Sequence, residues 1–376
     1  MTLSLAHLIP QVEKMAEELA EERIHHHKVL GKVQELLSLY SISAFDFKAK
    51  AKELGVAIPS HEPIDHREPP KPITSPFFAI AADGSQIQPD RHGIALYYLI
   101  NVGSIVLKEG SGETPIPKST PYLYYKDEDL YEGNRLVQGN LLDVRRELAE
   151  LQELTARVKE VAERAQEGKI PILALADGTL LLWVLEEEKD RHLDKIKAYV
   201  GEMEEIRKAG ALLAGFISRP RYTEVVDLLR LLHFGEEPFS YPPHRRPWGR
   251  LTDAALFSFL PIGWRSALFE CSSPLNDYYG ESRIFFFYLN IAGEIARIEI
   301  PGWIAQSQEL VDLVHGAILK QSENTRGYPY VLERAHELAV IKASERRSLE
   351  EMIERAMFRR GLSPLVSPKE RWKRLI

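Results

Sequence analysis

Two short apolar runs in this sequence each end in an Asp-Gly pair, and they constrain the fold more than any other feature. The first covers residues 77–82 and leads into Asp83. The second covers residues 172–176 and leads into Asp177. Runs of this length are too short for typical helices and suit strands that are buried on both faces. We therefore expect a sheet in which two carboxylates follow buried strands.

An Asp-Gly pair after a hydrophobic run is most often a simple turn, and that reading applies to either site taken alone. At the first site we predict that Gly84 and Ser85 turn the chain directly after the strand. Two such pairs, separated by strands and one long helix, are harder to attribute to turns only. A carboxylate held at the end of a buried strand has little freedom, which suits a metal ligand.

The segment between the two pairs predicts strands followed by a helix that carries two glutamates. Residues 94–107 are rich in β-branched and aromatic side chains, which fits one or two antiparallel strands bent near Gly103. Residues 134–168 place apolar side chains at helical spacing, and Glu147 and Glu150 lie three residues apart on one side. Carboxylates gathered in this way repel one another and are stabilised as anions by a cation among them.

His336 is a further candidate ligand in the carboxyl-terminal part of the chain. Residues 328–361 predict a helix, in which His336 follows Leu332 by one turn and precedes Val340 by one turn. A single histidine on an apolar helical face is usually a core residue. A neutral imidazole can also bind a divalent metal, so both interpretations stay open.

Composition excludes several classes of function. The chain of 376 residues is 44% hydrophobic and 27% charged, with a net charge of −7, as in ordinary soluble proteins. No apolar run is long enough to span a bilayer, and we expect a cytoplasmic protein. Cys271 is the only cysteine and has no partner motif for nucleophilic chemistry. A phosphate-binding loop ending in Gly-Lys-Ser/Thr and zinc-hydrolase histidine spacing are both absent from the sequence.

Composition shifts predict four segments. Residues 1–57 form an amphipathic helical extension, which serves dimerisation or partner docking or merely caps the core. Residues 58–76 are proline-rich and form a linker or an extended wrap over the surface. A core domain covers residues 77–360, and residues 361–376 form a basic tail.

The order of these elements resembles the ribonuclease H-like (PIWI-like) fold, and the motifs resemble the NurA family of DNA end-processing nucleases. The motifs are ADGSQIQPDRHG at 82–93, VRRELAEL, LADGTL at 175–180, FFFYLN and GYPYVLERAHELAVI at 327–341. The resemblance implies an α/β fold with a mixed sheet flanked by helices, preceded here by the amino-terminal helical extension. It also implies a 5′-to-3′ exonuclease and single-strand endonuclease that acts in double-strand break resection.

The resemblance implies a site with two Mn²⁺ ions, or Mg²⁺ as the alternative, and no other cofactor. Asp83 would bridge the ions, Asp177 and a helix glutamate (Glu147 or Glu150) would complete one site, and His336 would bind the second ion. The implied partners are a HerA-type hexameric ATPase, a second copy in a homodimer, and DNA ends bound without sequence preference. A non-catalytic DNA-binding or scaffold subunit that regulates the ATPase is the alternative function.

Some basic and aromatic residues are candidates for contacts with DNA, with surface ion pairs and core packing as their alternatives. The candidates are Arg91, Arg146, Arg265, Arg283, Tyr278 and Tyr279.

Overall fold

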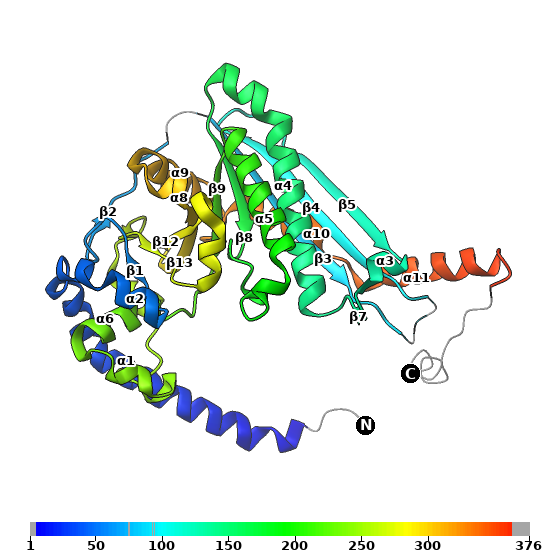
Figure 1. The fold of residues 1–376 in the computed structure, drawn as a ribbon. Coiled ribbons are helices and arrows are strands. Elements are labelled where there is room, and N and C mark those ends of the chain that lie inside the picture. Colours follow the sequence, from blue (N-terminus) through cyan, green and yellow to red (C-terminus); the bar gives the residue numbers. More distant parts are fainter. Residues whose placement is uncertain (1–4, 74–75, 92, 94, 363–376) are drawn as a thin grey trace. The chain divides into compact units, whose positions relative to one another are not determined.

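The computed structural model describes residues 5–73, 76–91, 93 and 95–362, and it divides into two compact units (Figure 1). Unit 1 consists of residues 1–70, 217–276 and 283–299. Unit 2 consists of residues 71–216, 277–282 and 300–376. Across the described ranges, no helix is both long enough and apolar enough to cross a membrane.

Unit 2 is built on a mixed sheet with the strand order β9-β8-β3-β4-β5. Strand β4 runs antiparallel to both β3 and β5, whereas β8 and β9 run parallel to β3. Their apolar side chains form most of the buried core of this unit. This arrangement confirms the predicted α/β, ribonuclease H-like class. The strands are β3 (Phe77–Ile87), β4 (Tyr98–Glu109), β5 (Ile116–Tyr124), β8 (Ile172–Asp177) and β9 (Leu212–Ile217).

Helices cover both faces of this sheet, and two glycines mark where they approach most closely. A Cβ on Gly84 would meet α4 (Asn140–Gly168), and a Cβ on Gly103 would meet α10 (Tyr330–Ala339). Gly103 pairs with Asp83, so Gly84 points to the opposite face of the sheet. Therefore α4 and α10 lie on opposite faces. The remaining elements of unit 2 are α3 (Asp127–Leu130), β6 (Tyr131–Glu132), β7 (Arg135–Leu136), α5 (Leu193–Lys208), α8 (Gly302–Ala305), α9 (Gln308–Ser322) and α11 (Ala343–Phe358).

Three local predictions for unit 2 are wrong. The chain does not turn at Gly84, because β3 continues to Ile87 in register with β4. Gly103 does not bend β4; it leaves room for the backbone of α10, whose Ala339 nitrogen would lie 2.4 Å from an added Cβ. The predicted single helix over 328–361 is two helices, since α10 ends at Ala339 and α11 begins at Ala343. In the first two cases glycine serves close approach rather than a turn or bend.

Unit 1 combines a small sheet with several helices. Its strands follow the order β1-β11-β12-β13, with β10 paired to β12 and β2 paired to β10. The predicted hairpin between β12 and β13 is confirmed, and Ala292 and Gly293 form its turn with φ of 53° and 95°. The elements are α1 (Ile9–Leu39), α2 (Lys48–Leu54), β1 (Ile58–Pro59), β2 (Arg67–Glu68), α6 (Glu224–Phe234), α7 (Asp253–Leu256), β10 (Arg265–Ser266), β11 (Phe269–Glu270), β12 (Ile284–Ile291) and β13 (Glu294–Pro301).

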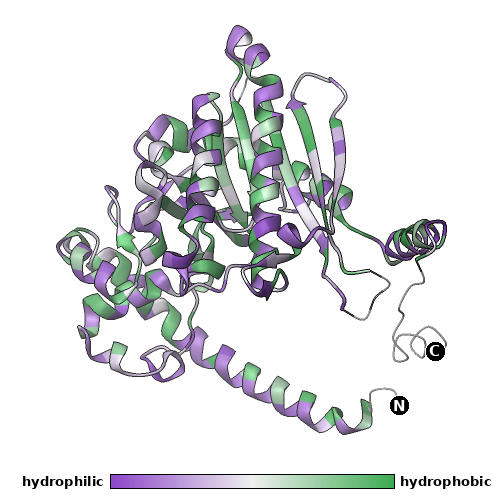
Figure 2. Ribbon diagram, turned by 45° about the vertical axis from the view of Figure 1, so that its right-hand side comes forward, coloured by the Kyte–Doolittle hydropathy of each residue, from purple (hydrophilic) through white to green (hydrophobic). Residues whose placement is uncertain are grey.

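The predicted amino-terminal helix is present as α1, and its two halves differ. Val33 and Leu37 near its carboxyl end are buried, whereas Val12, Met15 and Leu19 are each more than half exposed. Figure 2 shows hydrophobic and hydrophilic segments alternating along the helix that leads to the amino terminus. The carboxyl-terminal half of α1 therefore belongs to the core of unit 1.

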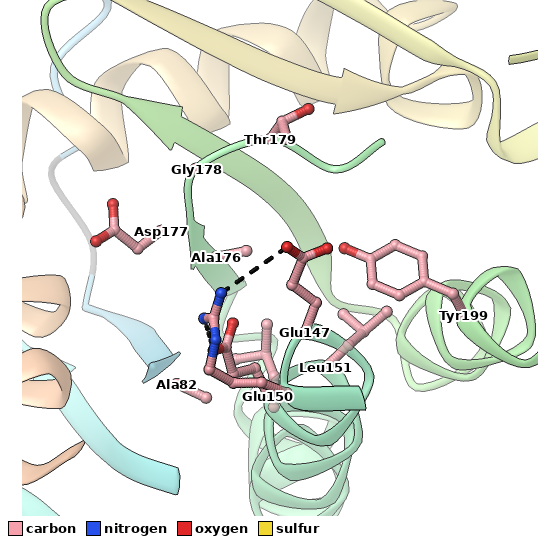
Figure 3. A pocket seen from close by; sticks show the side chains of 11 residues that line it. Ala82, Glu147, Glu150, Leu151, Ala176, Asp177, Gly178, Thr179 and Tyr199 are labelled. Atoms are coloured by element: carbon pink, nitrogen blue, oxygen red, sulfur yellow. Dashed lines mark hydrogen bonds and ion pairs between the residues drawn. The ribbon is translucent and has the colours of Figure 1, made fainter. Parts of the chain in front are cut away.

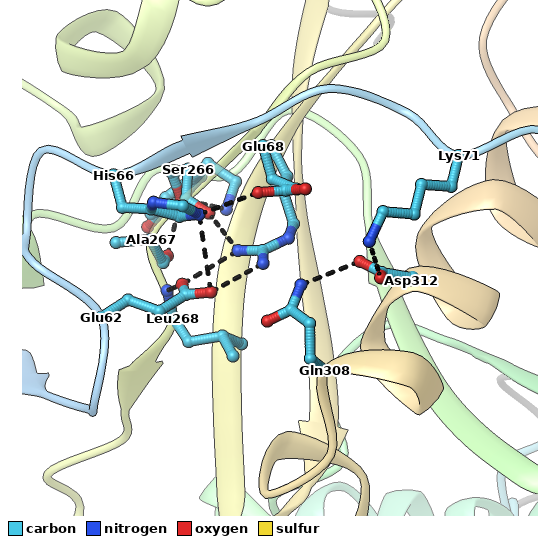
Figure 4. Close-up of polar contacts among 11 residues, drawn as sticks. Glu62, His66, Glu68, Lys71, Ser266, Ala267, Leu268, Gln308 and Asp312 are labelled. Carbon is cyan, nitrogen blue, oxygen red and sulfur yellow. Dashed lines mark hydrogen bonds and ion pairs between the residues drawn. The ribbon is translucent and has the colours of Figure 1, made fainter.

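The proline-rich segment wraps along unit 1 as far as residue 70. Its strands β1 and β2 pair with β11 and β10. Between them, Glu62 is buried and accepts two hydrogen bonds from Arg265, at 2.9 and 2.7 Å, and one from the Leu268 N–H at 2.7 Å (Figure 4). Of the two predicted alternatives, the extended wrap describes this part of the segment. The compact units thus follow other boundaries than the four predicted segments, and most of the predicted basic tail lies outside the described residues.

Candidate active site

Two adjacent parallel strands bring Asp83 and Asp177 together. Ala82 on β3 pairs with Ala176 on β8, so each aspartate is the next residue on its strand. The backbones of neighbouring strands lie about 5 Å apart. The Asp83 side chain is only 12% exposed and accepts a hydrogen bond from the Gly84 N–H at 2.8 Å. Asp177 is the last residue of β8 and is exposed. The two apolar runs of the sequence thus form the neighbouring strands that carry these aspartates.

Helix α10 adds His336 to the face that carries Asp83. The Nδ1 atom of His336 lies 2.7 Å from the Asp83 Oδ2 atom, and the imidazole remains 61% exposed. Just before this helix, Tyr328 hydrogen-bonds to Asp177, and its ring packs edge-on against Phe216 with centroids 5.4 Å apart. The imidazole is therefore oriented by one carboxylate and still accessible to a ligand.

Helix α4 supplies the glutamates, and Gly84 is the reason that one of them reaches β3. An added Cβ on Gly84 would lie 2.5 Å from the Glu150 Oε1 atom, so any side chain there would displace this carboxylate. Arg146, one turn earlier, forms an ion pair with Glu150 and lies 3.9 Å from Glu147. Glu150 is thus the glutamate that reaches the residue next to the first aspartate, whereas Glu147 lies one turn nearer the amino end of the helix.

Glu147 and Glu150 line a cavity of about 160 Å³ together with Ala82 and Asp177. In Figure 3 both glutamates project from α4 on one side of β8, and Asp177 points away on the other side. Consequently, in the part of the chain that the structure describes, no three His, Cys, Asp or Glu side chains are grouped closely enough to hold a metal ion as they stand.

Burial and the repulsion of neighbouring carboxylates raise the pKa values of Glu147, Glu150 and Asp177. Burial raises the pKa of Glu150 to about 8, with Asp83 and Glu147 adding to the shift and Arg146 opposing it. Burial likewise raises the pKa of Glu147 to about 7, against the effect of Arg146. The pKa of Asp177 is raised by partial desolvation and by Asp83, while Tyr328 opposes the shift. The protein thus holds several acids where their charged forms are disfavoured.

The donor atoms suit a divalent cation. Carboxylate oxygens are the preferred ligands of Mg²⁺ and Mn²⁺, and imidazole shifts the preference toward Mn²⁺. The space against Gly84 is occupied by Glu150 rather than by a side chain of β3, which allows a carboxylate from α4 to approach Asp83. A cation would stabilise the charged forms of these acids.

Burial corrects two of the predicted DNA contacts. Arg265 is completely buried in its ion pair with Glu62, and Tyr279 is 1% exposed with its hydroxyl accepting the Leu182 N–H. Neither side chain can reach DNA in this fold, because both are core residues of their units.

The other four candidates keep some accessibility. Arg91 is exposed, and Arg283 is exposed with an ion pair to Glu270 at 3.3 Å. Tyr278 is 40% exposed and donates its hydroxyl to Asp190, while Arg146 is half-buried between the site glutamates. A role in binding DNA stays a prediction for these residues.

Sequence reasoning missed two contributors to the site. Tyr328 was not singled out, although it directly precedes Pro329 at the start of the His336 helix. Gly84 was interpreted as part of a turn, whereas it opens the face of β3 to α4. A glycine inside a strand is the available signal for such a close approach.

Fold and site together define a ribonuclease H-like domain with an acidic cluster at the junction of two parallel strands. The NurA domain family matches residues 79–341, and the chain belongs to this family. Membership of this family indicates a nuclease. No curated protein sequence matches the chain significantly.

Several solved structures are similar at low sequence identity. The NurA nuclease from Sulfolobus solfataricus is 16% identical, with 92% of this chain and 97% of that chain covered and a TM-score of 0.47. The endonuclease V of Ciona intestinalis in complex with DNA is 10% identical, over 82% and 98% of the chains, with a TM-score of 0.32. Drosophila Piwi is 12% identical, over 71% and 30% of the chains, with a TM-score of 0.28.

Proposed function

We propose that this protein is a metal-dependent deoxyribonuclease whose active site comprises Asp83, Glu150, Asp177 and His336. One observation carries the proposal: Glu150 lies against Gly84, next to Asp83, while His336 bonds to that same aspartate. Helices α4 and α10 thus bring ligand-type side chains to Gly84 and Asp83 on β3, and β8 adds Asp177 on the neighbouring strand. Membership of the NurA domain family supports the assignment. Glu147 lines the same cavity and is proposed as an auxiliary acid rather than as the main helix ligand.

The residues of the chain have distinct proposed roles. Asp83 and Glu150 supply carboxylates from opposite faces of β3, Asp177 adds a third from β8, and Tyr328 restrains it through a hydrogen bond. His336 presents its Nε2 atom because its Nδ1 atom faces Asp83. When bound, a pair of divalent cations supplies an activated water and stabilises the leaving oxygen of a phosphodiester.

The finer features of the activity are proposed from the family resemblance. They comprise Mn²⁺ as the metal, 5′-to-3′ exonuclease and single-strand endonuclease action, and resection of DNA double-strand breaks together with a HerA-type hexameric ATPase. A homodimer that acts in the cytoplasm on DNA ends, without sequence preference, is part of the same proposal.

Replacement of Asp83 by Ala tests the function directly. The purified protein should degrade linear DNA in the presence of Mn²⁺. Asp83→Ala should lower the rate by at least about 10²- to 10³-fold, because a preorganised charged group at the reacting centre is lost. Circular dichroism and a melting curve serve as folding controls. Cleavage at the wild-type rate by a folded Asp83→Ala protein would exclude this site.

One observation favours the alternative of a non-catalytic scaffold subunit. Arg146 is ion-paired with Glu150, so a guanidinium already neutralises the glutamate nearest to Asp83. In a scaffold this pair would be permanent, and Mn²⁺ would not change the melting temperature. In a nuclease Mn²⁺ competes with Arg146, so saturating Mn²⁺ should raise the melting temperature of the wild type but not of Asp83→Ala.

A further inference from the structure

We propose that Asn101, together with Ser85, is a positioning residue that fixes the end of α10 and thereby holds His336 against Asp83. This inference rests on the proposed function, because it concerns a residue of the same site. It assigns a role in metal binding to two polar residues of the sheet that need not touch the metal themselves.

The two residues belong to a short ladder on the face of the sheet that α10 covers. Asp83 pairs with Gly103 across β3 and β4, and Ser85 pairs with Asn101 two residues further along. Side chains at alternate positions of a strand point to the same face, so these two cross-strand pairs lie side by side beneath the helix. The first pair contains the carboxylate that His336 contacts.

The second pair of the ladder binds the carboxyl end of α10. The Asn101 Nδ2 atom donates to the Ala339 carbonyl at 2.8 Å and to the Leu338 carbonyl at 3.2 Å. The Ser85 hydroxyl donates to the same Ala339 carbonyl. The last carbonyls of a helix have no partners within the helix, so these side chains act as a cap supplied by the sheet. His336 is only one turn before Ala339.

The Asn101 amide is itself held in place. The residue is only 8% exposed, and the Ser119 hydroxyl donates to its Oδ1 atom at 3.1 Å. With Oδ1 accepting from β5, the amide nitrogen is left to face the two helix carbonyls. The cap is therefore fixed by three neighbouring strands.

Gly103 supports the same geometry through packing. An added Cβ there would lie 2.4 Å from the Ala339 nitrogen and 2.5 Å from the Ala335 carbonyl oxygen, so the helix backbone rests directly on β4. Contact with Gly103 sets the distance between α10 and the sheet, and the cap sets the position of α10 along its own axis. Together they determine where His336 meets Asp83.

The test measures Mn²⁺ binding to the full-length protein by isothermal titration calorimetry, together with DNA affinity and cleavage kinetics. Asn101→Asp keeps the shape of the side chain and removes its N–H donors, and Ser85→Ala is a milder second variant. Each should weaken Mn²⁺ binding by about 10- to 100-fold, as expected for groups that orient a metal ligand. The kcat should fall, while the KM for DNA should stay within about twofold because neither residue is proposed to contact DNA.

Ser104→Ala is the matched control on the same strand. Ser104 is fully buried and donates to Glu153 at 2.8 Å, on the face opposite to α10. Its replacement removes a comparable buried hydrogen bond without touching the cap, so Mn²⁺ affinity should not change. Amide hydrogen exchange adds a metal-free readout, since the Val340 N–H that bonds to the His336 carbonyl should exchange at least about 10-fold faster in Asn101→Asp.

Two outcomes would overturn the positioning role. One is unchanged Mn²⁺ affinity in Asn101→Asp and Ser85→Ala despite faster exchange at Val340. The other is an equal loss of Mn²⁺ affinity in Ser104→Ala, which would show that the loss reflects a general destabilisation of the fold rather than the loss of the cap. The proposed function is judged separately. If the wild-type protein binds Mn²⁺ but cleaves no DNA, the assignment as a nuclease is refuted. The effect of the variants on Mn²⁺ affinity would still test the positioning role.

Discussion

The two units of this protein bury acidic side chains in opposite ways. In unit 1, burial alone would raise the pKa of Glu62, but the hydrogen bonds and charge of Arg265 and the Leu268 N–H lower it below its ordinary value. In unit 2, burial raises the pKa of Glu150 to about 8 although Arg146 is paired with it. The difference is that burial dominates at Glu150, with Asp83 and Glu147 adding to it, whereas at Glu62 Arg265 and the Leu268 N–H together outweigh burial.

The comparison separates a structural ion pair from a functional acidic cluster. Arg265 presents two N–H groups to Glu62, so the buried charge is matched and serves only to anchor the extended segment. One guanidinium in unit 2 faces more than one carboxylate, which leaves negative charge for an incoming cation. Strongly perturbed acids in a cavity are typical of functional sites.

Replacement of Glu150 by Gln should give the largest change. Activity should fall by about 10³-fold, because a preorganised carboxylate at the reacting centre is lost. The metal-free protein should become more stable near pH 8, because a disfavoured charge is removed. Glu147→Gln is the matched comparison and should cost less activity. Nuclease assays and melting curves measure both effects, and equal losses of activity would contradict the assignment of Glu150.

Breaking the matched pair of unit 1 should mainly affect stability. Glu62→Gln leaves the completely buried Arg265 without its counter-charge and should cost about 3–5 kcal/mol of unfolding free energy. Denaturant unfolding measures this change. Cleavage per folded molecule should stay the same, because Glu62 belongs to unit 1 and the proposed site belongs to unit 2. A loss below about 1 kcal/mol would show that the pair is not an anchor.

The pH dependence of stability should differ between the two kinds of acid. For Glu150 the folded pKa of about 8 lies above the ordinary value, so its stability penalty grows as pH rises from about 4.5 to 8. For Glu62 the folded pKa is lowered, so its contribution is present above about pH 4.5 and is lost as pH falls further. The metal-free protein should therefore be most stable in mild acid.

Glu150→Gln isolates the contribution of the site to this profile. Asp253 of unit 1 is also buried with a pKa raised to about 7, so it adds to the same trend in both proteins. The wild type should lose on the order of 2–3 kcal/mol more than the variant between pH 5 and pH 8 without metal. Chemical denaturation at a series of pH values measures the difference, and parallel profiles would contradict the shift in pKa.

The smallest effect is expected at an exposed ion pair. Arg283→Ala removes the 3.3 Å contact with Glu270, which should change the unfolding free energy by less than about 0.5 kcal/mol. If Arg283 also contacts a DNA phosphate, the slope of binding affinity against salt concentration should fall by about one unit. An unchanged slope would exclude the contact with phosphate and leave the ion pair with Glu270 as the role of Arg283.

The sequence predicted the order of elements and most of the candidate ligands, because apolar runs and helical spacing report burial. The identity of the closer glutamate depended on Gly84, whose role in packing cannot be told from a turn without the neighbouring helix. Arg265 and Tyr279 were misassigned because an arginine or tyrosine in a polar or aromatic segment looks the same whether its partner is DNA or a buried carboxylate or amide. Such partners are distant in sequence and only meet in the fold.

A crystal of the wild-type protein grown with Mn²⁺ and measured for anomalous scattering tests the central claim most directly. The account predicts a Mn²⁺ peak coordinated by both Asp83 and Glu150, with Arg146 displaced from its present partner. A protein that cleaves DNA with its Mn²⁺ bound elsewhere, and with the ion pair between Arg146 and Glu150 intact, would contradict it.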